Sequence, residues 1–253
     1  MTETNNSQTA PDLSVVVPVF NEDGNIAPLV AEIVAALGER VSYEIVYVDD
    51  ASTDASAETL AKLAASQPAL RIIRHRRRSG QSAAIHTGVK TARGNLIVTL
   101  DGDGQNDPAD IVRLLDIYKV ESAAGDKPIL IAGNRTQRRD GLVKRISSKT
   151  ANRVRAALLG DQTPDTGCGL KVFSRDDFLA LPAFDHMHRF LPALMLRHGG
   201  RVASVAVGHR PRKLGASKYG VWDRLWIGII DVIAVAWLKR RPLNPDFDEQ
   251  NDG

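Results

Sequence analysis

Two carboxylates separated by a single glycine stand out in the sequence. The stretch "LDGDGQNDP" (100–108) places Asp101 and Asp103 directly after the apolar run "NLIVT", and the side-chain amide of Gln105 follows two residues later. Oxygen ligands at alternate positions suit Mg²⁺ or Mn²⁺, and an ion held by few carboxylates keeps open positions for substrate phosphates. The same composition is also common in turns. Taken alone, the stretch leaves a divalent-metal site and a plain turn open.

Apolar runs that alternate with helical patterns surround these carboxylates. The runs predict strands at 13–19, 43–50, 70–75, 95–101 and 129–134. Helical patterns lie between them, at about 26–37, 55–66, 79–93 and 108–121. Strands separated by helices of this length predict βαβ units. We therefore expect an α/β fold, with a Rossmann-like, mostly parallel sheet flanked by helices.

The carboxyl ends of these strands predict a binding edge, because ligands of such sheets bind there. The rule brings residues 18–22, 49–50 and 101–105 to one rim of the sheet. Carboxylates that cluster without a cation raise each other's pKa, which favours an ion among them. No G-x-G-x-x-G follows the first strand and no G-x-x-x-x-G-K-[ST] occurs, which argues against a dinucleotide oxidoreductase and a P-loop NTPase.

Composition and charge are those of an ordinary globular protein. The chain has 253 residues, 43% of them hydrophobic, and a net charge of +3. Its basic residues gather at 74–78, 135–145, 209–213 and 239–241. Such clusters suit nucleic acid, phosphorylated small molecules or an anionic membrane, and they also occur as solvated surface. We interpret 74–78 as a solvated edge, with a phospholipid contact as the alternative.

The single cysteine fits a reducing compartment, and the N-terminus shows no secretion signal. Cys168 has no second cysteine to pair with, which excludes an internal disulfide. We interpret it as a small packing residue and not as a nucleophile. A zinc site with His186 and His188 is disfavoured by the spacing. The polar N-terminus lacks the pattern of a signal peptide, so it reads as a disordered lead-in.

The last apolar segment predicts an amphipathic helix. Its core, 225–238, has 14 residues and contains Asp231, whereas a bilayer needs about 20 apolar residues. A wide apolar face lies opposite the charged residues Asp223, Arg224 and Asp231; it consists of Trp222, Leu225, Trp226, Ile229, Ile230, Ile233 and Trp237. Tryptophans and a terminal "KRR" suit a membrane interface. Packing on the core or in a dimer fits the pattern equally. The cationic stretch 145–159 is a second candidate for lipid contact.

Five motifs occur in order along the chain: "SVVVPVFNE", "YEIVYVDDASTD", "LDGDGQNDP", "DTGCGLKVF" and "GASKYG". The similarity that they carry extends from residue 13 to about residue 241. In these motifs the chain resembles family 2 glycosyltransferases of the GT-A fold, and among these the dolichol-phosphate mannose synthase group of polyprenyl-phosphate glycosyltransferases. The resemblance implies a GT-A domain at 13–215 and a membrane-interface helix at 216–241. A disordered tail at 1–12 and an acidic tail at 242–253 flank them.

The resemblance also implies a donor site for a nucleotide diphosphosugar. Residues expected to hold the base and ribose are Pro18, Val19, Glu22 and Asp50. The divalent cation, Mg²⁺ or Mn²⁺, would bind Asp101, Asp103 and Gln105, and would bridge the donor diphosphate. A basic loop that closes over the diphosphate is expected to contribute Arg212, Ser217 and Lys218. Thr166, Gly167 and Gly169 match a segment beside the sugar and the acceptor.

The resemblance also implies a set of residues that bind the acceptor phosphate: Arg135, Lys144, Arg145 and Ser148. The expected catalytic residues are Asp103, Arg135, Arg145 and Ser148. Lys144 departs from the family, which has an arginine there, and lysine is a point charge and not a bidentate fork. His188 and Arg189, in "HRFLP", resemble a family segment that could reach the acceptor pocket.

The implied function is an inverting, metal-dependent transfer of a hexose or uronic acid from a GDP- or UDP-sugar to a polyprenyl phosphate. A cation with arginine and lysine would stabilise the leaving diphosphate. A phosphate acceptor is already anionic near pH 7 and needs no general base, and the sequence shows no convincing histidine–carboxylate dyad. We expect a peripheral protein on the cytoplasmic membrane face, with a small integral-membrane partner.

Other functions stay open at this point. One is a family 2 transferase that acts on a glycan or lipid hydroxyl, which would need a carboxylate base near the rim. Another is a non-catalytic, membrane-docked binding subunit, which the intact D-x-D-x-Q argues against. Nucleic-acid binding is disfavoured, because aromatic residues do not interleave with the arginine clusters.

Overall fold

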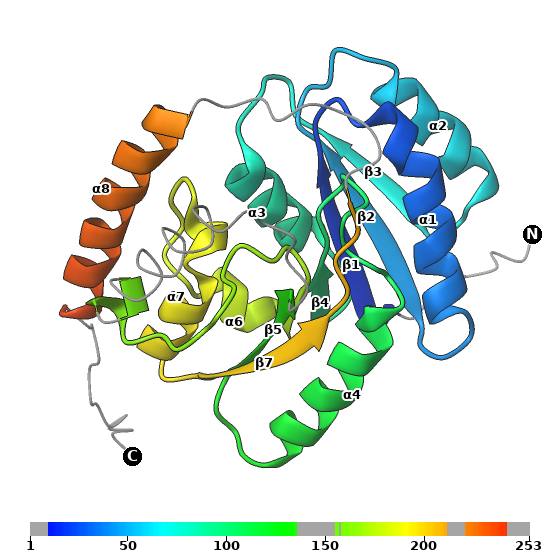
Figure 1. Cartoon of the computed structure of the whole chain (residues 1–253). Helices are drawn as coiled ribbons and strands as arrows, with labels where there is room; N and C mark the ends of the chain where they lie inside the picture. Colours follow the sequence, from blue (N-terminus) through cyan, green and yellow to red (C-terminus); the bar gives the residue numbers. More distant parts are fainter. Residues whose placement is uncertain (1–9, 136–154, 157, 212–220, 242–253) are drawn as a thin grey trace, which may run out of the picture.

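A computed structural model describes residues 10–135, 155–156, 158–211 and 221–241. These residues build one seven-stranded sheet in the order β3-β2-β1-β4-β6-β5-β7 (Figure 1). The strands are β1 (Leu13–Val19), β2 (Tyr43–Asp49), β3 (Leu70–Arg74), β4 (Leu96–Thr99), β5 (Ile129–Arg135), β6 (Lys171–Ser174) and β7 (Arg201–Val207). Strand β6 runs antiparallel to both of its neighbours, and the other pairings are parallel. The predicted mostly parallel α/β sheet is thus confirmed.

Helices cover both faces of the sheet. On one face lie α1 (Asp23–Leu37), α2 (Ser56–Ser66) and α4 (Asp110–Ala123). The other face carries α3 (Gln81–Thr91), α6 (Arg175–Leu179), α7 (Leu191–Arg197), the 3₁₀ turn η1 (Met187–Arg189) and α8 (Val221–Lys239). Side chains of β1 alternate between the two layers, because successive residues of a strand point to opposite faces. Val15 and Val17 pack in the first layer and Val16 in the second.

The ends of several elements differ from the prediction. Strand β2 ends at Asp49 and β4 at Thr99, so Asp50 and Asp101 lie in the loops that follow and not on the strands. Helix α1 begins at Asp23, three residues before the predicted start. The short antiparallel strand β6 and the late strand β7 were not predicted. The four residues of β6 include a lysine, and so few residues show no clear strand pattern.

Helix α8 packs one side on the protein and leaves an apolar side exposed. Val235 is 1% exposed, and Val232 and Ala236 pack beside it against the core. The exposed side comprises Ile229, Ile230, Ile233 and Trp237, which are 42–63% exposed. No helix in the described part of the chain has the length and apolarity needed to cross a membrane. The domain boundary predicted at residue 215 falls in 212–220, outside the described residues.

Candidate active site

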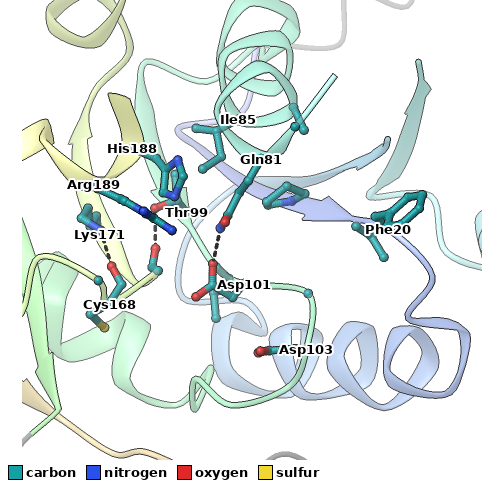
Figure 2. A pocket seen from close by; sticks show the side chains of 18 of the residues that line it. Phe20, Gln81, Ile85, Thr99, Asp101, Asp103, Cys168, Lys171, His188 and Arg189 are labelled. Carbon is teal, nitrogen blue, oxygen red and sulfur yellow. Dashed lines mark hydrogen bonds between the residues drawn. The ribbon is translucent and has the colours of Figure 1, made fainter. Parts of the chain in front are cut away.

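A pocket of about 560 Å³ opens where the central strands end. Residues that follow β1, β2 and β4 line one part of its wall, and residues from the segments before β6 and α7 line another. Figure 2 shows Asp101 near the middle, Phe20 on one side and Lys171, His188 and Arg189 on the other. The pocket therefore lies at the rim that the strand-end rule predicted.

Asp101 and Asp103 both line this pocket. Gln81, at the start of α3, donates from Nε2 to Asp101 Oδ1 at 2.8 Å. Burial, and after it the charge of Asp103, raise the pKa of Asp101 to about 6, although Lys171 and Arg135 act to lower it. A carboxylate that is costly to ionise alone would be stabilised by a divalent cation.

Two close approaches of the backbone need glycine. A Cβ at Gly169 would lie 2.3 Å from the Asp101 carboxylate, and a Cβ at Gly102 would lie 2.8 Å from the carbonyl oxygen of Pro18. The two glycines therefore let the carboxylate loop lie between the end of β1 and the segment before β6. This packing sets the position of Asp101.

The donor set at Asp101 and Asp103 fits a divalent cation. Within the described residues, no group of three or more His, Cys, Asp or Glu side chains could hold a metal ion. An ion at these two carboxylates would therefore take its other ligands from water and substrate. Gln105 does not line the pocket; its Nε2 donates to the Arg210 carbonyl at 3.4 Å. Its role as a metal ligand stays a prediction.

The predicted donor residues Pro18, Val19, Glu22 and Asp50 all line the pocket. Asp50 Oδ1 accepts from the Ser79 N–H at 2.8 Å, and Oδ2 accepts from the Gly80 N–H at 2.8 Å. The Asp50 carboxylate therefore holds the turn that leads into α3. Its role toward a ribose stays a prediction.

A histidine–carboxylate pair that the sequence reading did not expect lies beside this wall. His75 Nδ1 is 2.7 Å from Asp50 Oδ1, and His75 Nε2 is 3.0 Å from Thr87 Oγ1. The pairing arises because β2 and β3 are neighbours and end side by side. Both ring nitrogens of His75 are occupied and His75 does not line the pocket, so the pair supports the wall and is not placed to act as a base.

The arginines of the basic cluster 74–78 are exposed, as expected for a solvated edge, but Arg78 also has a pocket contact that was not expected. Its guanidinium lies over the Phe20 ring, 4.1 Å from the ring centroid, and both residues line the pocket. A cation stacked on an aromatic ring is a stabilising contact. The turn held by Asp50 brings Arg78 to the end of β1, and no local pattern in the sequence could show this.

Arg135 and Lys171 supply positive charge to the other wall. Arg135 Nε and Nη2 donate to the two carboxylate oxygens of Asp165 at 2.6 and 2.8 Å, which fixes the guanidinium. Lys171 on β6 is buried, which lowers its pKa. Its ammonium donates to the carbonyl oxygens of Thr166 and Cys168. The sequence reading missed Lys171, whose location depends on the unpredicted strand β6.

The segment 166–169 lies at the pocket, and its place beside the sugar and the acceptor stays a prediction. Thr166, Gly167 and Gly169 line the pocket, and the Gly169 carbonyl accepts from Thr99 Oγ1 at 2.6 Å. Cys168 is buried against Gly133, and burial raises the pKa of its thiol. This agrees with its interpretation as a packing residue.

Six predicted residues lie outside the described chain: Lys144, Arg145, Ser148, Arg212, Ser217 and Lys218. Two arginines that flank these segments, Arg155 after 136–154 and Arg210 before 212–220, form ion pairs with carboxylates. Arg155 makes two hydrogen bonds with the buried carboxylate of Asp161, at 2.8 and 3.1 Å. Arg210 pairs with Glu32 at 2.5 Å and with Asp107 at 2.8 Å.

Comparison with known proteins agrees with this geometry. Residues 14–181 match the model of the family described as "Glycosyl transferase family 2". The chain is 38% identical over 250 residues to the dodecaprenyl-phosphate galacturonate synthase of Rhizobium johnstonii, which covers 96% of this chain and 71% of that protein. It is 33% identical over 211 residues to the undecaprenyl-phosphate 4-deoxy-4-formamido-L-arabinose transferase of Aeromonas hydrophila, covering 83% of this chain and 63% of that protein.

Solved structures show the same fold. The glucosyl-3-phosphoglycerate synthase of Mycobacterium tuberculosis, crystallised with Mn²⁺, UDP-glucose and phosphoglyceric acid, superposes with a TM-score of 0.62. The two chains are 20% identical, and the match covers 90% of this chain and 79% of that one. At this identity the likeness concerns the fold, and the predicted GT-A architecture is confirmed.

Proposed function

This chain belongs to glycosyl transferase family 2, and we propose that it transfers a sugar from a nucleotide diphosphosugar to a polyprenyl phosphate. The observation that carries the proposal is the pocket itself. It is lined by the carboxylate pair Asp101 and Asp103 and by the cations Arg135 and Lys171, which lie beside the segment 166–169. Polyprenyl phosphate is the acceptor in the names of the two relatives described above.

The donor would lie across the carboxylate pair. The nucleoside would contact the end of β1, beside Phe20 and Arg78, and the diphosphate would lie at Asp101 and Asp103. A divalent cation held there, Mg²⁺ or Mn²⁺, would stabilise the negative charge that develops on the leaving diphosphate. Arg135, oriented by Asp165, would add an N–H donor and positive charge on the acceptor side.

The carboxylates of the pocket favour a phosphate acceptor over a hydroxyl acceptor. A hydroxyl needs a base, and each candidate carboxylate already has another partner. Asp50 accepts from two backbone N–H groups, Glu22 accepts from Asn25 at 2.7 Å, and Asp103 accepts from the Gln105 N–H at 3.1 Å. A phosphate oxygen needs no base, because it is anionic near pH 7.

The proposed reaction is a direct displacement. An acceptor phosphate oxygen forms a bond to the anomeric carbon while the bond from that carbon to the diphosphate oxygen breaks, which inverts the configuration. Arg135 would orient the acceptor phosphate, and Lys144, Arg145 and Ser148 are proposed to join it. Arg212, Ser217 and Lys218 are proposed to cover the donor diphosphate.

The exposed face of α8 supports a peripheral membrane location. Ile230, Ile233 and Trp237 are each about 60% exposed on one side of this helix, and Arg241 lies over the Trp237 ring at 5.3 Å. An apolar helix face with tryptophan and flanking cations suits a membrane interface. We propose that this face docks on the membrane that holds the lipid acceptor, at its cytoplasmic side, where a small integral-membrane protein could be its partner.

A transfer assay tests the function. Purified protein, Mn²⁺, undecaprenyl phosphate and a panel of labelled UDP- and GDP-sugars should give label in the organic phase. Asp103→Asn should abolish the transfer, whereas Asp116→Asn, on the exposed side of α4, should leave it unchanged. Transfer to a glycan hydroxyl, without transfer to the lipid phosphate, would establish the alternative acceptor class.

A further inference from the structure

One end of the pocket carries an arginine that has no acidic partner within the part of the chain that the structure describes. Arg189 lines the pocket beside His188, on the opposite side of Asp101 from Phe20 (Figure 2). Among the described residues no carboxylate and no carbonyl oxygen accepts from its guanidinium. Arg135 differs, because Asp165 holds it, and the ammonium of Lys171 is turned to two carbonyl oxygens.

Local packing directs both side chains into the pocket. His188 and Arg189 belong to the 3₁₀ turn η1, and the residues on either side of them, Met187 and Phe190, are buried, at 2% and 4% exposure. The turn is closed by the Phe190 N–H, which donates to the Met187 carbonyl at 2.8 Å. Since the two core residues lie on one side of this tight turn, the two residues between them face the pocket.

Ser82 determines which ring nitrogen of His188 carries the proton. The Ser82 hydroxyl oxygen accepts from the His188 backbone N–H at 3.3 Å and lies 2.7 Å from Nδ1 of the ring. Ser82 is buried and its hydroxyl hydrogen has no other acceptor among the described residues. The hydroxyl therefore donates to Nδ1, and the ring keeps its proton on Nε2. Burial lowers the pKa of His188 to about 3, with help from the charges of Lys171 and Arg189.

The pair therefore offers one positive charge, a planar fork of N–H donors and one further N–H. We propose that Arg189 and His188 bind a carboxylate on the transferred sugar, so that the donor is a nucleotide-activated uronic acid. This inference rests on the proposed function and adds the class of sugar.

Charge and position favour a carboxylate of the sugar over the acceptor phosphate. With the nucleoside near Phe20 and the diphosphate at Asp101, the sugar would extend toward Lys171, His188 and Arg189. A guanidinium fork matches the two oxygens of a carboxylate, and one positive charge balances one negative charge. An acceptor phosphate carries more charge than this pair supplies, and Arg135 is available for it on another wall.

Matched donors test the inference, because UDP-galacturonate and UDP-galactose differ only at C6. UDP-glucuronate with UDP-glucose, and GDP-mannuronate with GDP-mannose, complete the panel. Donor affinity is measured by titration calorimetry with Mn²⁺ and without acceptor, and turnover is measured with undecaprenyl phosphate. The wild-type chain should prefer a uronate over its neutral partner by roughly 10- to 100-fold, as expected for hydrogen bonds to a charged group.

The variants identify the residues responsible. Arg189→Met should lower the affinity for the uronate to that for its neutral partner, whereas Arg189→Lys should retain part of the preference. Ser82→Ala should weaken the preference less, because the His188 ring could then take its other tautomer. The control is Arg40→Met, which changes an exposed arginine three residues after the end of α1. Circular dichroism confirms that each variant is folded.

Two results would overturn the inference. One is a wild-type chain that transfers a neutral sugar as well as, or better than, its uronate. The other is an Arg189→Met variant whose affinity falls equally for both donors of a pair, or in which only the KM for the acceptor rises. Either outcome would assign Arg189 to a phosphate. A chain that transfers no sugar from any donor would instead contradict the proposed function.

Discussion

The Asp101 carboxylate lies so close to Gly169 that a Cβ on that glycine would be 2.3 Å from it. The contact joins the carboxylate loop to the segment 166–169. Lys171 donates to the carbonyl oxygens of Thr166 and Cys168 in this segment, and Thr99 donates to that of Gly169. The position of the proposed metal ligand thus depends on residues that lie about seventy positions further along the chain.

Gly169→Ala should therefore displace Asp101 and lower kcat by roughly 100-fold, the cost of misplacing a reactive group by about 1 Å. The variant should still fold, since the strain is confined to the rim. Steady-state kinetics and far-UV circular dichroism measure the two effects. The control is Gly228→Ala on α8, where an added Cβ meets nothing within 4 Å. Equal activity of the two variants would contradict the structural role of Gly169.

Asp101→Asn should stabilise the metal-free protein at pH 7 by up to about 3 kcal/mol. The reason is that burial raises the pKa of Asp101 to about 6, whereas the unfolded chain has an ordinary carboxyl pKa near 3.9. Between these values the folded state binds more protons, so stability falls as pH rises from about 4 to about 6. An asparagine does not ionise, so the variant avoids the cost of holding a buried carboxylate in the folded state.

Urea unfolding of the two proteins without metal, at pH 4 and pH 7, measures the difference. The gain from Asp101→Asn should be present at pH 7 and absent at pH 4. The same variant should lose Mn²⁺-dependent binding of the donor. A gain that is equal at both pH values would show that Asp101 does not titrate as stated.

Lys171→Met should destabilise the fold by about 1–3 kcal/mol, because the carbonyl oxygens of Thr166 and Cys168 lose their shared donor. It should also lower turnover, since the segment 166–169 lines the pocket. Denaturant unfolding and kinetics test both effects, with Lys90→Met on the exposed side of α3 as the control. A variant as stable as the control would refute the supporting role of Lys171.

The exposed face of α8 should determine membrane binding. The triple change Ile230→Ser, Ile233→Ser and Trp237→Ser should weaken binding to anionic liposomes by at least about 10-fold. The reason is that three largely exposed apolar side chains can no longer partition into the lipid. Flotation assays measure the bound fraction. Val120→Ser, which changes a 71% exposed residue on α4, should leave binding intact. Undiminished binding of the triple variant would exclude this face as the docking surface.

The strands of the first half of the chain were predictable because each is an apolar run between helical patterns. Strand β1 was predicted with its observed ends, Leu13 and Val19. Strand β6 has four residues and carries a lysine, so its pattern is too short to be read. Its antiparallel insertion between β4 and β5 is a long-range pairing, and no local propensity specifies it.

By itself, the sequence determined that a carboxylate pair follows a buried strand, that the sheet is mostly parallel, and that the strand ends form the binding rim. These properties follow from local pattern and from the alternation of strands and helices. Only the tertiary structure decided that Arg78, Lys171 and His188 face the same pocket, and that Ser82 lies 2.7 Å from Nδ1 of the His188 ring. Their contacts join segments far apart in the chain, and such contacts depend on packing that no single segment encodes.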